Sequence, residues 1–379
     1  MIISPWRDQF DLPRDIAYLN AAQIGPMPRR AVQAGQAAYQ AKARPWSRTV
    51  AGEFFDTPEA LRKAAAGLFH ATPDDIALVP AASYGLAVAA RNLKLKAGQE
   101  ILVLDGQFPS NVYTWREMAK RDGATVKTIA RRQGESWTEA LLAQIGPQTA
   151  LAACGAIQWI DGGAIDLETV GAEARANGAS LVLDLTQSLG VMDFNVQAVK
   201  PDFAVAAGYK WLLGPYSLGY LYVAPQHQAG EPLEENWINR EGSEDFSQLI
   251  NYRDGYQPGA RRFDMGERSN HQLAPAALEA LAVLGEIGVE AAVSHCAAVN
   301  DALIEAAAPF GLRADTPDRA GHYLSLSLPG EAPADLAKQL MARGVHVSQR
   351  GPRLRVSPHL YSDGEDVARF AEALRAVLG

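Results

Sequence analysis

The sequence predicts an α/β protein: a large domain, with a mostly parallel sheet of seven strands between helices, is followed by a smaller α+β domain. Short apolar runs alternate with helix-like stretches between residues 75 and 224, as they do in βαβ units. The runs are apolar throughout, which is typical of strands buried on both faces. Beyond about residue 260 this alternation stops. Two domains also agree with the chain length of 379 residues.

The elements of the large domain follow in order from these runs. Two of the expected helices end at Gly123 and Gly178, and glycine is the residue that most often terminates a helix. We expect strands over 75–80, 100–105, 125–130, 149–158, 179–184, 203–208 and 218–224, and helices over 84–93, 112–123 and 167–178.

The segment 225–258 is polar and rich in glycine and proline, so we expect an extended loop region with a functional role. We place the domain boundary just after it. The large domain then covers 15–259, and the small domain covers 260–379 together with the N-terminal segment 1–14. For the small domain we expect helices over 273–311, 334–344 and 366–378, and strands over 322–328, 345–349 and 353–357.

Composition argues against several classes of protein. A net charge of −8 without a basic cluster disfavours a nucleic-acid partner, and no apolar run is long enough to predict a membrane span. The first residues do not resemble a signal peptide. Two cysteines cannot form a disulfide framework, so we expect a cytoplasmic protein. The seven histidines lack metal-ligand spacing, and we expect no metal.

The residues that follow the strands are the candidate site, because open parallel sheets bind ligands beyond the carboxyl ends of their strands. Ala82 and Ser83 follow the first strand and open a helix. The unpaired N–H groups of that first turn can hold an anion, although Ser83 can also be an ordinary N-cap. Phe108 follows the second strand, where it either stacks on a flat ligand or packs in the core.

Charged residues follow the central strands. Asp184 comes directly after an apolar run, with Gln187 three residues further on. A carboxylate in that place needs a cation or a donor, unless it is an N-cap or a salt-bridge partner. Tyr209 and Lys210 follow the next run. A lysine at the edge of a core either reaches solvent with its charge or is an amine used as a nucleophile.

An anion cradle, an aromatic ring, a carboxylate and an amine together suit a flat heteroaromatic cation that carries an aldehyde and a phosphate. We therefore expect pyridoxal 5′-phosphate (PLP) as the cofactor. Lys210 would form a Schiff base with its aldehyde, and Asp184 would keep its ring nitrogen protonated. Phe108 would stack on the ring, and Ser83 would hold the phosphate.

The same residues lie in segments that resemble the class V aminotransferase family of fold-type I PLP enzymes. This family includes cysteine desulfurases, kynureninases and isopenicillin N epimerase-like proteins. The segments cover most of the chain and are specific only when they are taken together. They are IAYLNAAQIGPMP, AASYGLA, QFPSNVYTW, AIQWIDGGAIDL, LVLDLTQSLG, AAGYKWLLGP, GARRFDMGERSN and LRVSPHLYSDGEDV.

The resemblance implies a role for each matched residue. Lys210 matches the Schiff-base lysine, and Asp184 matches the partner of the pyridinium nitrogen. Gln187 matches the group that hydrogen-bonds the ring O3′. Arg355 matches the arginine that binds the substrate α-carboxylate, for which a bidentate guanidinium is well suited.

Further matches concern the phosphate and the faces of the ring. Ala82 and Ser83 match the phosphate cradle, and Tyr209 matches a phosphate-binding residue of kynureninase-like members. Phe108 falls where kynureninases place a stacking phenylalanine. Gln158 falls near a polar residue over the ring.

The segment RFDMGERSN departs from the family pattern. Desulfurase-like members carry a threonine, which reaches the phosphate of the other subunit, where Glu267 stands here. A glutamate would repel phosphate, so either Arg268 or Ser269 makes that contact or it is lost. The family still implies a homodimer.

The family implies that Lys210 takes a proton from the α-carbon of an amino-acid substrate. We favour an aminotransferase; the alternatives are a PLP-dependent Cβ-lyase, of the kynureninase or C–S lyase kind, and an amino-acid epimerase. A persulfide-forming desulfurase is disfavoured because Cys154 and Cys296 lie in a predicted strand and a predicted helix.

Two other classes of protein fit the sequence less well. A nucleotide-dependent enzyme would need a glycine-rich phosphate turn, which is not found. A non-catalytic binding protein on this fold would not need Lys210, Asp184 and Arg355 together. The substrate side chain is expected to meet the N-terminal segment YLNAAQIGPMP and the segments 44–55 and 225–258. In the last two, aromatic residues form an apolar wall or pack locally: Trp46, Trp237 and Tyr256.

Overall fold

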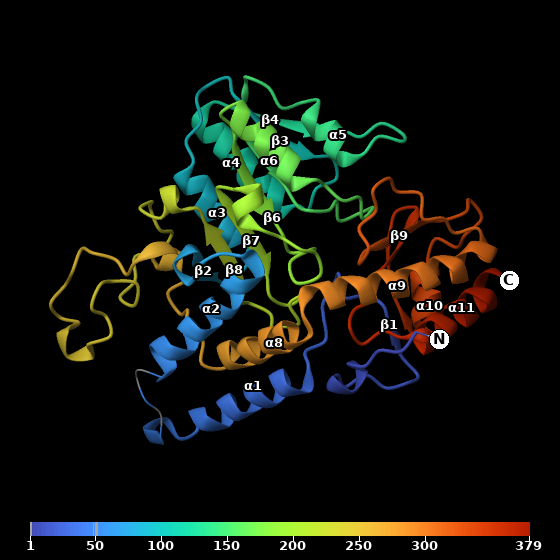
Figure 1. Ribbon diagram of the computed structural model, residues 1–379, viewed down its shortest axis with the longest axis horizontal. Coiled ribbons are helices and arrows are strands. Elements are labelled where there is room, and N and C mark those ends of the chain that lie inside the picture. Colours follow the sequence, from blue (N-terminus) through green and yellow to red (C-terminus); the bar gives the residue numbers. More distant parts are fainter. Residues whose placement is uncertain (1, 48, 50–51) are drawn as a thin grey trace.

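A seven-stranded sheet forms the centre of the computed structural model, which describes residues 2–47, 49 and 52–379 (Figure 1). The strand order is β2-β8-β7-β6-β5-β3-β4, and β8 runs opposite to its two neighbours. The mostly parallel sheet of the prediction is therefore confirmed. Its strands are β2 (Ile76–Val79), β3 (Glu100–Leu104), β4 (Thr125–Ile129), β5 (Thr149–Cys154), β6 (Ser180–Asp184), β7 (Phe203–Ala207) and β8 (Gly219–Val223).

Both faces of the sheet are covered, because successive side chains of each strand point to opposite sides. Ile101 and Val103 of β3 belong to one hydrophobic core, and Leu102 and Leu104 belong to the other. On the first face lie α3 (Ala82–Asn92) and α4 (Ser110–Asp122). On the second face the helices are α2 (Thr57–Phe69), α5 (Trp137–Leu142), α6 (Leu167–Ala176), α7 (Val196–Val199) and α8 (Leu273–Ile287), with α1 (Arg29–Lys42) packed on α8.

The C-terminal part has its own core and its own sheet of three antiparallel strands, in the order β11-β12-β9. Ala17 and Leu19 from the N-terminal part pack in this core, and β1 (Ala17–Tyr18) pairs with β10. Both chain termini lie at this end of the molecule (Figure 1). Its further elements are α9 (Val289–Ala307), β9 (Leu324–Ser327), α10 (Leu336–Met341), β10 (Val345–His346), β11 (Ser348–Arg350), β12 (Arg353–Val356) and α11 (Gly364–Leu378).

Three details differ from the expected elements. The strand expected over 149–158 ends at Cys154, where its pairing with β6 ends. Gly155 then packs closely on the next strand end, since a Cβ there would stand 2.8 Å from the Asp184 carbonyl oxygen. The helical region 273–311 divides at Gly288, whose φ of 83° interrupts the helix. Ala260 and α8 pack with the large sheet, and the division of the chain near residue 260 stays a prediction.

Candidate active site

A cavity of about 480 Å³ lies beyond the carboxyl ends of β2, β3, β5, β6 and β7. Open parallel sheets bind their ligands at this edge, where loops rather than helices cover the strand ends. The cavity wall brings together eight of the residues singled out from the sequence: Ala82, Ser83, Phe108, Gln158, Asp184, Gln187, Tyr209 and Lys210.

Lys210 lies in the turn after β7, and it is only 7% exposed. The N-terminal segment packs against this turn, because Gly25 N–H donates to the Tyr209 carbonyl at 2.9 Å. A Cβ at Gly25 would stand 2.1 Å from the Lys210 carbonyl oxygen, so only glycine permits the approach. Leu213 and Ser217 have φ values of 57° and 67°, and such strain is concentrated at functional turns.

The environment of Lys210 makes its amine easier to deprotonate than that of a surface lysine. Burial lowers the pKa of Lys210 to about 8; Asp184 acts against this lowering, and the charges of Arg355 and Arg350 add to it. The Nζ atom lies 5.5 Å from the centre of the Phe108 ring. An amine that loses its proton near neutral pH can act as a nucleophile or a base.

Asp184 ends β6 and faces the same cavity. The Thr186 N–H donates to Asp184 Oδ1 at 3.0 Å. Burial nevertheless raises the pKa of Asp184, although Thr186 and the charge of Lys210 lower it in part. In the described chain Asp184 and Lys210 form no direct ion pair, so the carboxylate remains available for a cationic group of a ligand.

The first turn of α3 supplies an anion site. Its N-cap residue, Ala81, has an extended backbone and no side chain that could cap the helix. The exposed Ser83 adds a hydroxyl at the same place. Uncapped N–H groups and the helix dipole both attract a negative charge such as a phosphate.

Aromatic and amide side chains form another part of the cavity wall. Phe108 is partly exposed and packs edge-to-face on Trp159, with ring centres 5.5 Å apart. Gln158 is held in place because its Nε2 donates to the Asp105 carbonyl at 2.9 Å. Tyr209 packs on Tyr216, with centres 4.5 Å apart. A flat ligand would therefore meet mostly rings and amides here.

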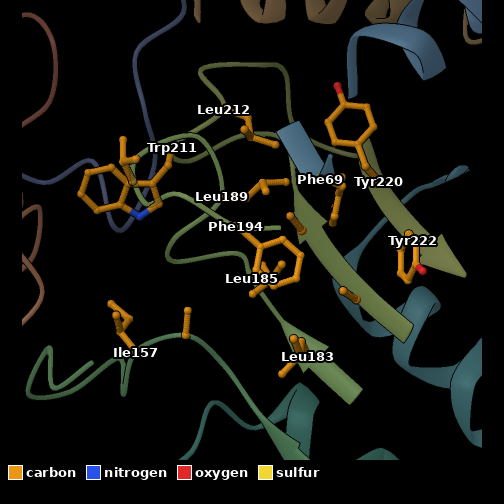
Figure 2. Close-up of a cluster of buried hydrophobic side chains, with 14 of the residues drawn as sticks. Phe69, Ile157, Leu183, Leu185, Leu189, Phe194, Trp211, Leu212, Tyr220 and Tyr222 are labelled. Carbon is orange, nitrogen blue, oxygen red and sulfur yellow. The ribbon is translucent and has the colours of Figure 1, made fainter. Parts of the chain in front are cut away.

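A hydrogen-bonded network behind Lys210 fixes the turn to the C-terminal part of the chain. Trp211 Nε1 donates to Gln187 Oε1 at 2.9 Å, and Gln187 Nε2 donates to the Ala22 carbonyl at 3.0 Å. His322 Nε2 bonds the Gln187 carbonyl at 2.7 Å, and His359 Nε2 bonds the Trp211 carbonyl at 3.0 Å. Figure 2 shows Trp211 and its neighbour Leu212 in the apolar cluster that anchors the turn: Ile157, Leu183, Leu185, Leu189 and Phe194.

Arg355 is 2% exposed on β12, and its described partners are all neutral. Its Nε donates to Ser348 Oγ at 2.8 Å, and weaker contacts of 3.4 Å reach Tyr323 and Asn20. A buried guanidinium without a carboxylate is costly unless a ligand supplies one. Arg355 does not line the cavity itself, but its charge reaches Lys210.

Other residues considered from the sequence lie elsewhere. Arg268 is fully buried, and its NH1 lies 2.8 Å from Asp264, so its charge is balanced within the chain. Ser269 Oγ donates to the Phe54 carbonyl, and Glu267 is exposed. The cavity lining does not include Trp46, Trp237 or Tyr256. Residues 48, 50 and 51 of the segment 44–55 lie outside the described residues.

The sequence analysis did not name Thr186 or Trp159 as site residues, and it named the segment that contains Asn20 and Gly25 but neither residue by itself. Thr186 follows β6 directly, so the same strand-end argument could have found it. Among the residues that the structure describes, no group of His, Cys, Asp and Glu could hold a metal. Within that same part of the chain, each helix is too short or too polar to span a bilayer.

Fold and cavity together define an α/β protein that can hold a flat anionic ligand next to a reactive amine. The family described as aminotransferase class-V matches residues 17–370, and the chain belongs to this family. It is 27% identical to isopenicillin N epimerase of Streptomyces clavuligerus, over the full length of both chains. It is 26% identical to kynureninase of Deinococcus radiodurans, over 98% of this chain and 92% of the relative.

Solved structures show the same fold. A mutant of C-DES with glycine covalently linked to its PLP cofactor has a TM-score of 0.88, with 20% identity over 99% of this chain and 100% of that chain. The apo cysteine desulfurase of Thermococcus onnurineus has a TM-score of 0.85, with 21% identity over 100% and 98%. The α/β class predicted from the sequence is therefore confirmed.

The cofactor of this family is PLP, and the cavity fits it. The uncapped turn of α3 offers N–H donors to a phosphate. The Lys210 amine forms no ion pair in the described chain, and burial lowers its pKa to about 8. Asp184 offers a carboxylate to a cationic ring nitrogen. The expectation of PLP from the sequence is thus confirmed.

Proposed function

We propose that the protein is a PLP-dependent aminotransferase that acts on a free amino acid through Lys210. The observation that carries the proposal is the buried Lys210 amine, whose pKa burial lowers to about 8, on the wall of a cavity that also contains Asp184 and the α3 N-terminus. PLP, when bound, supplies a ring that accepts the electrons of a bond broken at the substrate α-carbon.

The chain's own residues then have separate tasks. Lys210 Nζ would hold the cofactor aldehyde and would serve as the base for the proton of the substrate α-carbon. Asp184 holds the ring nitrogen protonated by charge pairing. Ser83 and the α3 N–H groups hold the phosphate, and Arg355 binds the α-carboxylate.

The properties of the two cysteines argue against a desulfurase reaction, which would need a reactive cysteine to carry a persulfide. Burial raises the pKa of Cys154 and of Cys296 to about 12. Neither thiol forms a thiolate near neutral pH, and neither lines the cavity.

Epimerisation is the second candidate, because the likeness to isopenicillin N epimerase covers the whole of both chains. It also begins with loss of the α-proton to a base, so the same Lys210 would serve. A PLP-dependent Cβ-lyase is the third candidate, on the likeness to kynureninase.

Product analysis separates these reactions. The cofactor-loaded protein is incubated with single amino acids and a 2-oxo acid in D₂O, and the products are followed by NMR. An aminotransferase yields a new 2-oxo acid and a new amino acid. An epimerase yields the enantiomer or diastereomer with deuterium at the α-carbon, and a lyase cleaves the side chain. Aminotransfer is rejected if the amino group never moves to the acceptor in the whole panel.

We also infer a cytoplasmic homodimer. The dimer is supported by apolar side chains that stand exposed on the segment 225–258, which projects from one end of the molecule (Figure 1). A reducing compartment is supported by the two cysteines, which are buried and unpaired.

A further inference from the structure

The β11–β12 hairpin presents three arginines on one face. Ser348 pairs with Arg355 and Arg350 pairs with Arg353 across the two antiparallel strands. Residues two apart on a strand, and residues directly opposite on its neighbour, share one face of a sheet. Arg350, Arg353 and Arg355 therefore form a row of positive charge on the side where Arg355 reaches Tyr323 and Asn20.

Only one of these charges is balanced by an acid in the described chain. The NH2 atom of Arg353 lies 3.1 Å from Asp315. Arg355 has neutral partners. Arg350 donates to the carbonyl of its neighbour Gln349 at 2.9 Å and has no carboxylate within ion-pair distance in that part of the chain.

Arg350 lies next to the cavity. Its guanidinium carbon is 5.7 Å from the centre of the Trp159 ring, and Trp159 lines the cavity. Burial and the charge of Arg355 both lower the pKa of Arg350. The charges of Arg355 and Arg350 also act on Lys210, after burial and Asp184. The charges of two partly desolvated guanidiniums thus act on the reactive amine, and neither has a carboxylate partner among the described residues.

We propose that the substrate is an amino acid with an acidic side chain, whose second carboxylate is bound by Arg350 while Arg355 binds the α-carboxylate. The inference rests on the proposed function and adds its substrate class. A dicarboxylic amino acid supplies the two negative charges that the hairpin lacks. Each guanidinium can take one carboxylate by paired N–H donors, and the two sites together exclude amino acids with apolar side chains.

Binding of simple carboxylates to the cofactor-loaded protein tests this assignment. Isothermal titration compares succinate, glutarate and adipate with butyrate, valerate and hexanoate, the monocarboxylates of equal carbon number. We expect at least one dicarboxylate to bind about tenfold more tightly than its monocarboxylate partner. In Arg350→Met, which keeps a long apolar stem against Trp159, that preference should disappear while monocarboxylate binding is retained.

Two variants on the same hairpin serve as controls for Arg350→Met. Arg355→Met should weaken both kinds of acid, and Arg353→Met should alter neither, because Asp315 already balances Arg353. Thermal melting shows that each variant is folded, and Arg350→Gln, which also lacks the charge, replaces Arg350→Met if that variant is unstable. A wild-type protein without preference for any dicarboxylate overturns the proposal, as does an Arg350 variant that weakens both kinds of acid equally. Failure of PLP to bind at Lys210 overturns the proposed function instead.

Discussion

An amine enclosed by rings and apolar side chains loses its proton at a lower pH than an amine in water, and Lys210 is in that situation. A surface lysine keeps its proton until the pH nears its usual pKa of 10.4. Burial brings the pKa of Lys210 to about 8. At neutral pH about a tenth of the molecules therefore carry a nucleophilic amine, far more than for an exposed lysine.

The first prediction is that Lys210→Ala abolishes covalent binding of PLP and lowers turnover about a thousandfold or more, because the variant lacks both nucleophile and base. Visible absorbance and borohydride reduction followed by mass spectrometry measure the covalent bond. Lys94→Ala, an exposed lysine outside the cavity, is the control and should behave as wild type. A borohydride-stable link to PLP in the Lys210 variant would contradict the assignment.

The second prediction concerns pH. Only the deprotonated amine attacks an aldehyde, so the rate at which the apoprotein takes up PLP should rise as the pH increases and should reach half its maximum near pH 8. Stopped-flow absorbance between pH 6 and 10 measures this rate. A midpoint near the pKa of an ordinary lysine would show that the pKa of Lys210 is not lowered.

The third prediction is that Asp184→Ala keeps much of its PLP but loses activity about a hundredfold or more. The phosphate site and Lys210 remain, whereas the charge that holds the ring nitrogen protonated is removed. Cofactor content and kcat, measured on the same sample, separate the two effects. Turnover near the wild-type value would show that Asp184 is not needed to keep the ring nitrogen protonated.

At the residue scale the sequence predicted the cavity wall well, because strand ends in a parallel sheet converge at one edge. Lys210, Asp184, Ser83 and Phe108 each follow a different strand and meet at this cavity. Gly25 and Asn20 could not be predicted in this way. They reach the site from the N-terminal segment, and no local pattern records where that segment crosses the sheet.

At the scale of elements, two buried histidines hold the Lys210 turn and should make folding sensitive to acid. Burial lowers the pKa of His322 and of His359 to about 4. The unfolded chain binds these protons near pH 6.5. As the pH falls from 6.5 toward 4, the two histidines bind protons in the unfolded chain but stay neutral in the folded chain. The free energy of unfolding therefore decreases. Asp366, whose pKa burial raises to about 6, acts in the opposite direction.

The fourth prediction uses His322→Gln, which keeps an N–H donor for the Gln187 carbonyl but does not titrate. Urea denaturation at pH 7.5 and pH 5 gives the loss of stability on acidification. This loss should be smaller in the variant by about 2 kcal/mol, and the contribution of Asp366 cancels in the comparison. An unchanged loss would show that His322 is not held neutral.

The strands themselves were predictable because each is a short apolar run. The end of β5 was not, since the apolar run continues to Ile157 whereas the pairing with β6 ends at Cys154. No element was predicted for the first 70 residues, yet α1 and α2 lie there. These helices are stabilised by packing on α8, which lies more than 200 positions further along the chain.

At the scale of the whole molecule, the ends of the chain meet. The β1–β10 pair joins residues more than 300 positions apart, and such pairings leave no trace in local periodicity. Local periodicity also does not reveal whether two copies of the chain associate, which we infer instead from the exposed surface. Ile250 and Tyr252 are 81% and 95% exposed, which is unusual for side chains of this size when they are clustered.

The fifth prediction is that the protein sediments at twice the mass of one chain and that Ile250→Asp with Tyr252→Asp shifts it toward the monomer. Two carboxylates in an apolar interface lose their hydration without gaining a partner, which weakens association. Ile3→Asp is the matched control, because Ile3 is also exposed, and its neighbour Ile2 accepts a hydrogen bond from Gly364 N–H at the start of α11. That helix lies at the other end of the molecule (Figure 1). Sedimentation velocity distinguishes the outcomes: a monomeric wild type, or a dimeric double variant, would show that this segment does not join two copies.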